Sequence, residues 1–317
     1  MLKNQLNQNE PLVSVITNSF NSGAYIRSCV ASVLSQSYSN WEHIVVDCGS
    51  NDNTIKILSE MAHERLRVLE IPFCGVGVAR NFAINEAKGE IIAILDSDDV
   101  CFPERIKFQV KALIEDANLV AVGSSVKCVY ESNKREKCLH YPASSHGVLV
   151  TLRVGINTIP HSSLAFRLIS FKKLSGYLGY MEKAEDFDLL LRMTGLGLIK
   201  SIQIPLVKIA IRGDSHTSVH RPRGRDANFY VALSMILSDI EIQSDEMRCK
   251  IEAWLDNLGG RGVNNFIWFY QFKFLCKNIS KIDIVTIGFF LRSLISRFHF
   301  SLFSSRAIYG PSLLVAS

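Results

Sequence analysis

The segment Ile91-Ile-Ala-Ile-Leu-Asp-Ser-Asp-Asp99 is an apolar run that leads directly into three carboxylates. Its apolar part has the length of a buried β-strand, and such strands rarely end this way for structural reasons alone. Residues two apart in an extended segment project to the same side, so Asp96 and Asp98 are expected to face one cleft. Two such carboxylates suit a hard divalent cation that keeps open positions for phosphate oxygens. The structural alternative is an Asp-rich turn, with Asp99 capping a helix that starts near Pro103.

Before this segment, β-rich runs alternate with stretches whose apolar residues recur at helical spacing. The predicted strands are 13–17, 43–47, 67–71 and 91–95, and the predicted helices between them are 25–34, 52–61 and 78–87. This alternation implies right-handed crossovers and a mostly parallel α/β sheet with helices on both faces. In such sheets ligands bind beyond the carboxyl ends of the strands. Asp47 lies at such an end, where its carboxylate can accept hydrogen bonds from a nucleobase or ribose.

The pattern loosens after about residue 120. A hairpin is expected across 120–138, and a further strand within 160–166. A helix is expected to open at Glu185 and Asp186 and to end near Gly195, followed by a strand over 202–211. We therefore expect a catalytic domain over 1–220 and a helical, basic C-terminal region over 221–317.

Composition limits the class of protein. A chain of 317 residues that is 48% hydrophobic and 21% charged can bury one large core, with or without a small appended domain. The net charge of +5 is modest, and no run of lysine or arginine suggests a nucleic-acid partner. The eight cysteines are scattered without a C-x-x-C pair, which argues against a disulfide framework or a structural zinc site. The polar N-terminus lacks the layout of a signal peptide, so we expect a cytoplasmic location. This expectation allows contact with the inner face of the membrane.

Six short segments follow one another over the first hundred residues: 13–21, 32–38, 45–54, 79–81, 87–90 and 95–99. Together they resemble glycosyltransferase family 2, which has the GT-A fold. The resemblance continues more weakly through His161, Gly176, 184–188 and His216. It implies an enzyme that moves a sugar from a nucleotide-diphosphate sugar, with UDP-sugars favoured, to a saccharide or lipid-linked acceptor in surface polysaccharide biosynthesis. A sugar nucleotidyltransferase and a non-catalytic nucleotide-sugar-binding module remain alternatives.

The resemblance also assigns residues to the donor. The aspartate that matches Asp47 contacts the donor base, and Thr17 and Phe20 border the same pocket. Arg80 would face the donor nucleotide. Cys48 stands where the family commonly has a second aspartate, and this departure leaves the identity of the nucleotide open.

The metal site is implied in the same way. Asp98 would bind Mn²⁺ or Mg²⁺, and Asp96 would help to hold the ribose and the metal. His216 matches a position where some members supply a further metal ligand or a phosphate contact, although a lone histidine is more often a surface residue. The metal would act as a Lewis acid on the departing diphosphate.

Sugar transfer needs a base, because the attacking hydroxyl loses its proton as the new bond forms. The family places this carboxylate in a Glu-Asp pair that opens a late helix, and here Asp186 matches, with Glu185 beside it. The alternative is that both carboxylates merely interact favourably with a helix N-terminus. An inverting single displacement is implied. The chain lacks the Gln-x-x-Arg-Trp motif of processive synthases, so one transfer per acceptor is favoured.

The last 61 residues, 257–317, carry seven basic residues against one acidic residue. Apolar residues are dense over 284–303, but Arg292 and Arg297 interrupt every run before the roughly 20 residues that a membrane span requires. A basic amphipathic surface on anionic lipid fits this composition, and so does a helix docked on the catalytic domain or in a dimer.

Overall fold

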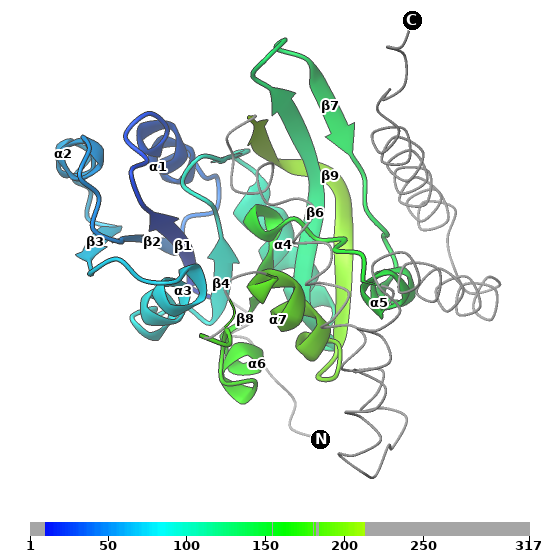
Figure 1. Ribbon diagram of the computed structural model, residues 1–317. Helices are drawn as coiled ribbons and strands as arrows, with labels where there is room; N and C mark the ends of the chain where they lie inside the picture. The colour runs from blue at the N-terminus through cyan, green and yellow to red at the C-terminus, as the bar shows by residue number, and fades with distance from the viewer. Residues whose placement is uncertain (1–9, 154, 180, 182–183, 213–317) are drawn as a thin grey trace, which may run out of the picture.

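A computed structural model of the chain describes residues 10–153, 155–179, 181 and 184–212 (Figure 1). Its strands are β1 Val13–Ser19, β2 Trp41–Asp47, β3 Leu66–Glu70, β4 Ile91–Ile94, β5 Val100–Cys101, β6 Leu119–Tyr130, β7 Glu136–Leu139, β8 Ala165–Arg167 and β9 Leu198–Ile211. Its helices are α1 Ile26–Leu34, α2 Thr54–Glu60, α3 Val76–Asn85, α4 Arg105–Glu115, α5 Ser145–Arg153, α6 Leu168–Lys173 and α7 Glu185–Met193, with one 3₁₀ turn, η1 His161–Ser163. The expected C-terminal helical region lies outside the described residues.

The nine strands form one mixed sheet in the order β3-β2-β1-β4-β8-β6-β9-β5, with β7 paired to β6. The four strands β3, β2, β1 and β4 are parallel, as their alternation with helices predicts. Beyond β4 the sheet changes direction, because β8 runs antiparallel to both β4 and β6, while β6 and β9 are parallel. The parallel part places the carboxyl ends of β1, β2 and β4 side by side at one edge.

The second half of the sheet agrees with the weaker sequence pattern. The expected hairpin is β6 and β7, which pair antiparallel from Val126 with Leu139 to Val129 with Glu136. The stretch 160–166 contains η1 before β8, so only its last two residues are strand. Helix α7 starts at Glu185 as predicted, and β9 starts four residues before the predicted strand.

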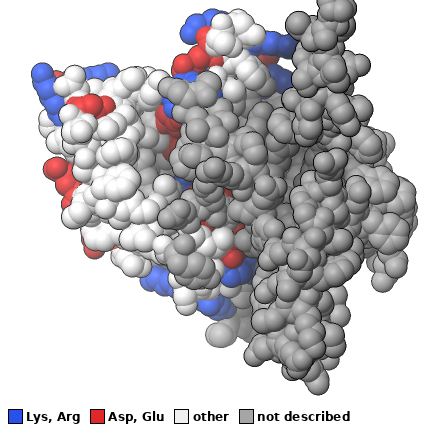
Figure 2. Space-filling model, in the orientation of Figure 1, with Lys and Arg blue, Asp and Glu red and all other residues white. Residues whose placement is uncertain are grey.

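Helices cover both faces of the sheet because β4 is apolar at every position (Figure 1). Ile92 and Ile94 pack in a core with buried residues of α3, α5 and α7. Ile91 and Ala93 point the other way, into a core with buried residues of α1 and α4. On the face of the molecule in Figure 2, the acidic and basic side chains of the described residues are intermixed.

A buried arginine, Arg105, anchors the end of β4. Its side chain is almost fully buried, and its Nη2 donates to the carbonyl oxygens of Ile94 at 2.7 Å and Leu164 at 3.3 Å. Its Nε donates to Gln109, whose amide in turn donates to the Ser163 carbonyl oxygen at 2.7 Å. Burial lowers the pKa of Arg105. Helix α4 therefore fixes both the end of β4 and η1, the two segments on which the Asp-rich turn rests.

Replacing Arg105 with methionine should lower the free energy of unfolding by about 2–3 kcal/mol, because buried polar partners lose their donor. Urea denaturation followed by circular dichroism measures the change. The matched control is Arg27→Met, whose guanidinium is 55% exposed and pairs with Glu60, and which should cost less than about 1 kcal/mol. Equal losses in the two variants would contradict the anchoring role.

Candidate active site

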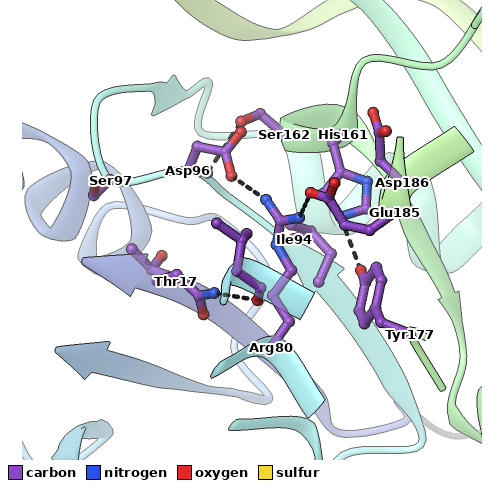
Figure 3. Close-up of polar contacts among 12 residues, drawn as sticks. Thr17, Arg80, Ile94, Asp96, Ser97, His161, Ser162, Tyr177, Glu185 and Asp186 are labelled. Carbon is purple, nitrogen blue, oxygen red and sulfur yellow. Dashed lines mark hydrogen bonds and ion pairs between the residues drawn. The ribbon is translucent and has the colours of Figure 1, made fainter. Parts of the chain in front are cut away.

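The candidate site lies at the carboxyl edge of the parallel strands. The turn after β4 carries Asp96, Ser97 and Asp98. The Ser97 hydroxyl is 2.8 Å from that of Ser22, in the loop after β1. The Ser162 hydroxyl of η1 accepts a hydrogen bond from the Asp96 backbone N–H at 3.0 Å (Figure 3). The Asp-rich turn is thus held from two sides.

Arg80 of α3 joins this turn to α7. Its Nη2 lies 2.9 Å from Asp96 Oδ1, and its Nη1 lies 2.9 Å from Glu185 Oε1 (Figure 3). The guanidinium carbon is 5.7 Å from the centroid of the Tyr177 ring, and the arginine side chain is only 7% exposed. Burial opposes ionisation of Asp96, but Arg80 outweighs it and holds the pKa of that carboxyl below its usual value.

The next residue of the same helix, Asn81, fixes the segment that packs beside Arg80. Its side-chain amide donates to the Tyr177 carbonyl oxygen at 2.8 Å, and its Oδ1 accepts from the Tyr177 N–H at 2.9 Å. Gly176 adopts φ +75°, and a Cβ there would lie 2.6 Å from Asn81 Oδ1. Glycine is therefore required for this close approach. The Tyr177 hydroxyl reaches His161 Nε2 at 2.8 Å, and burial lowers the pKa of His161 well below its usual value.

Asp186 follows Glu185 in the first turn of α7 but has different surroundings. Its Oδ2 accepts from the Asn157 amide at 2.9 Å, and its Oδ1 accepts from the Phe187 N–H at 2.7 Å. Burial raises the pKa of Asp186 to about 6, and the negative charge of Glu185 adds to this rise. Asn157 has no motif in the sequence that could have identified it, because its role depends on a contact across 29 residues.

Asp98 is paired with a different arginine. Its Oδ2 lies 2.5 Å from Arg212 Nη2, and Arg212 follows β9. Asp99 is buried and accepts from the Ala210 N–H at 3.3 Å. The alternative in which Asp99 caps a helix near Pro103 is wrong, because α4 begins at Arg105 and its N-cap is Glu104, without a side-chain cap.

Of the three residues predicted to lie near a donor base, two are buried and one is exposed. Asp47 accepts from the backbone N–H and hydroxyl of Ser50, at 2.8 and 2.5 Å, and is 1% exposed. The Thr17 side chain is fully buried, with its hydroxyl 3.0 Å from His43 Nε2. Phe20 is 47% exposed and lies against Phe73, with ring centroids 5.0 Å apart. Phe73 was not identified from the sequence, since it belongs to no motif.

The loops after β1 and β2 are tied together by the segment that follows Asp47. The Asp52 carboxylate accepts from the N–H groups of Gly23 at 3.0 Å and Thr54 at 2.9 Å. The Asn21 side chain accepts from the Asn51 N–H at 2.9 Å. Asp52 therefore connects two loops, whereas the residue at the N-cap of α2 is Asn53.

Asp96 and Asp98 of the Asp-rich turn carry the type of oxygen ligand that a divalent metal ion takes. Over the described residues, no group of three or more His, Cys, Asp and Glu side chains could hold a metal ion. The side chains of Asp96 and Asp98 are 39% and 28% exposed, so both can offer oxygen atoms. Mn²⁺ and Mg²⁺ commonly take one or two carboxylates and fill their other positions with phosphate oxygens and water. His216, the third predicted ligand, lies outside the described residues.

None of the helices in the described part of the chain has the length and apolarity needed to cross a membrane. The predicted amphipathic segment lies outside that part, so its contact with lipid stays a prediction.

Curated relatives are similar to more than half of this chain. A chondroitin synthase of Pasteurella multocida is 26% identical over 238 residues, which are 72% of this chain and 23% of that protein. The O-antigen biosynthesis glycosyltransferase WbnJ of Escherichia coli is 29% identical over 186 residues, which are 57% of this chain and 71% of WbnJ. The chain spans about a quarter to a third of the length of the first curated relatives it matches.

Solved structures share the fold. TarS of S. aureus in complex with UDP-GlcNAc has a TM-score of 0.54 at 23% identity, covering 65% of this chain and 60% of that chain. The mannosyltransferase PcManGT of Pyrobaculum calidifontis, in complex with GDP-Man and Mn²⁺, has a TM-score of 0.52 at 17% identity, covering 87% and 89%. These likenesses show a GT-A type sheet flanked by helices.

The sequence model described as "Glycosyl transferase family 2" matches residues 14–178, which include β1 to β8 and the Asp-rich turn. This match covers more than half of the chain. The chain belongs to glycosyl transferase family 2.

Proposed function

We propose that this glycosyltransferase moves a sugar from a UDP-sugar to a saccharide or lipid-linked acceptor by a single inverting displacement that depends on Mn²⁺ or Mg²⁺. The observation that carries the proposal is the Arg80 bridge, which connects Asp96 beside the donor edge to the first turn of α7. That turn also presents Asp186, whose raised pKa of about 6 suits a base near neutral pH.

In this proposal, Asp186 accepts the proton of the acceptor hydroxyl as the hydroxyl attacks the anomeric carbon. The carboxylate is held by the Asn157 amide and by the Phe187 N–H, so its orientation is set before the acceptor arrives. Glu185 is engaged with Arg80, which leaves Asp186 as the better candidate of the pair.

Asp98 and Asp96 would hold the metal ion, which when bound supplies Lewis-acid stabilisation of the diphosphate leaving group. Phe20 and Phe73 offer exposed aromatic surface for the donor base. Asp47 is almost fully buried beneath the Ser50 turn, so this turn would have to move for Asp47 to contact the base, and Thr17 would support the pocket from beneath.

A role in surface polysaccharide biosynthesis is supported by the similarity to an O-antigen biosynthesis glycosyltransferase and a chondroitin synthase. A UDP-sugar donor is supported by the complex of TarS with UDP-GlcNAc, and metal use by the complex of PcManGT with Mn²⁺.

The donor assignment is tested by thermal denaturation of the full chain with UDP, GDP or TDP, each with and without Mn²⁺. UDP with Mn²⁺ should raise Tm most, because a ligand at about 100 times its Kd stabilises the native state by about 2.7 kcal/mol. The Asp98→Asn variant should lose the part of the shift that requires Mn²⁺, whereas the surface variant Asp116→Asn should keep it. No shift with any nucleotide would contradict the donor site.

The base assignment is tested by Asp186→Asn. The rate of UDP release from UDP-sugars with saccharide acceptors should fall by about 10²–10⁴-fold, because the amide cannot take the proton. The thermal shift caused by UDP and Mn²⁺ should persist, since Asp186 is not proposed to bind the nucleotide. Turnover at the wild-type rate would exclude Asp186 as the base.

The pH dependence of kcat/KM tests the same residue in a different way. Only the ionised carboxylate can act as a base, so activity should fall about tenfold per pH unit below the pKa of about 6 and level off above it. Asn157→Ala removes a donor that favours the ionised form, so the acidic limb should move to higher pH. A limb that stays in place in Asn157→Ala would show that this contact does not set the pKa.

A further inference from the structure

The contact between Arg212 and Asp98 is built by the fold at the end of β9. Lys208 of β9 pairs with Val100, and the Ala210 N–H donates to Asp99, so this end of the strand is fixed against the Asp-rich segment. The Arg212 guanidinium then lies 2.5 Å from Asp98 and its carbon lies 4.0 Å from the centroid of the Tyr25 ring. The arginine side chain is 13% exposed, and both the carboxylate and the ring contact it.

Each outward-facing carboxylate of the Asp-rich turn is already paired with an arginine. Arg80 is paired with Asp96, and it is locked in place by a second carboxylate, Glu185. Arg212 reaches the remaining outward-facing carboxylate, Asp98, from another element of the fold. Two guanidinium groups thus occupy the carboxylates that a divalent cation would need.

A guanidinium and a divalent cation beside one carboxylate repel each other strongly, because both are positive and the site is partly withdrawn from water. Binding of the metal ion at Asp98 is therefore disfavoured while Arg212 holds that carboxylate. A guanidinium pairs well with phosphate oxygens, so the diphosphate of the donor offers it a second anionic partner in the same region.

We infer that Arg212 competes with the divalent metal ion for Asp98 and turns to the diphosphate when nucleotide and metal bind together. This inference rests on the proposed function, and it makes Arg212 a ligand-contacting residue that couples the binding of the metal ion to the binding of the nucleotide. Metal alone then binds weakly, and nucleotide and metal each strengthen the binding of the other, as linkage requires.

The test measures binding of Mn²⁺ by calorimetry and by the electron paramagnetic resonance signal of the free ion, with and without UDP. Arg212→Gln should bind Mn²⁺ alone at least about fivefold more tightly than the wild type, a coupling at the low end of the usual range. The gain in Mn²⁺ affinity on adding UDP should shrink by a similar factor. A gain in affinity is informative because a merely damaged site would bind the metal less well.

Two further variants serve as a control and as a second test of Mn²⁺ binding. Arg27→Gln breaks an arginine–glutamate pair of the same 2.5 Å length between α1 and α2, and should leave Mn²⁺ binding unchanged. Tyr25→Leu keeps the Arg212 charge but removes the ring beneath it, so it should also tighten binding of Mn²⁺ alone, by less than Arg212→Gln. If Arg212→Gln does not fold, the Mn²⁺ affinity of Tyr25→Leu tests the inference in its place.

Wild-type protein that binds Mn²⁺ with UDP, together with an Arg212→Gln variant whose affinity for Mn²⁺ alone is unchanged or weaker, would overturn the inference and leave the proposed function standing. If neither protein binds Mn²⁺ with or without UDP, the proposed metal dependence fails, and the inference fails with it.

Discussion

A buried guanidinium must be matched by anions or carbonyl oxygens, and this requirement organises the centre of the molecule. Arg80 meets it with Asp96 and Glu185, which are 89 residues apart in the chain and belong to different elements. Removing either carboxylate would leave one side of a guanidinium that is only 7% exposed without its hydrogen-bond acceptor. The end of β4 and the start of α7 are therefore held at a fixed separation by one side chain.

The sheet supplies the frame on which this bridge depends. Because β4, β1 and β2 are parallel neighbours, the segment that follows β4 emerges at the edge where the loops after β1 and β2 also emerge. Arg105 below and η1 beside the turn hold that edge through backbone carbonyl oxygens, so the turn does not rely on its own hydrogen bonds. The carboxylates of Asp96 and Asp98 can then reach Arg80 and Arg212 and the ligands that we propose.

The sequence predicts the parts of this arrangement that are local. Strand β4, the carboxylates after it and the start of α7 follow from apolar runs and helix-opening residues, and the first four strands pair as their alternation predicts. The antiparallel placement of β8 could not be predicted, because it depends on packing between distant segments. The same holds for Asn157, Phe73 and Arg212, whose partners lie far away in the chain. Whether the assigned donor, metal and base residues act as proposed is decided by the binding and kinetic experiments.

Two adjacent carboxylates can take different roles only if their surroundings differ, and α7 provides that difference. Glu185 is ion-paired with Arg80, whereas Asp186 is buried beside an amide and has a raised pKa. The charge on Glu185 itself contributes to the rise at Asp186. The Arg80 bridge between the Asp-rich turn and α7 therefore also influences the pKa of the proposed base, Asp186. A change at Arg80 would disturb both the position of α7 and the proposed proton transfer.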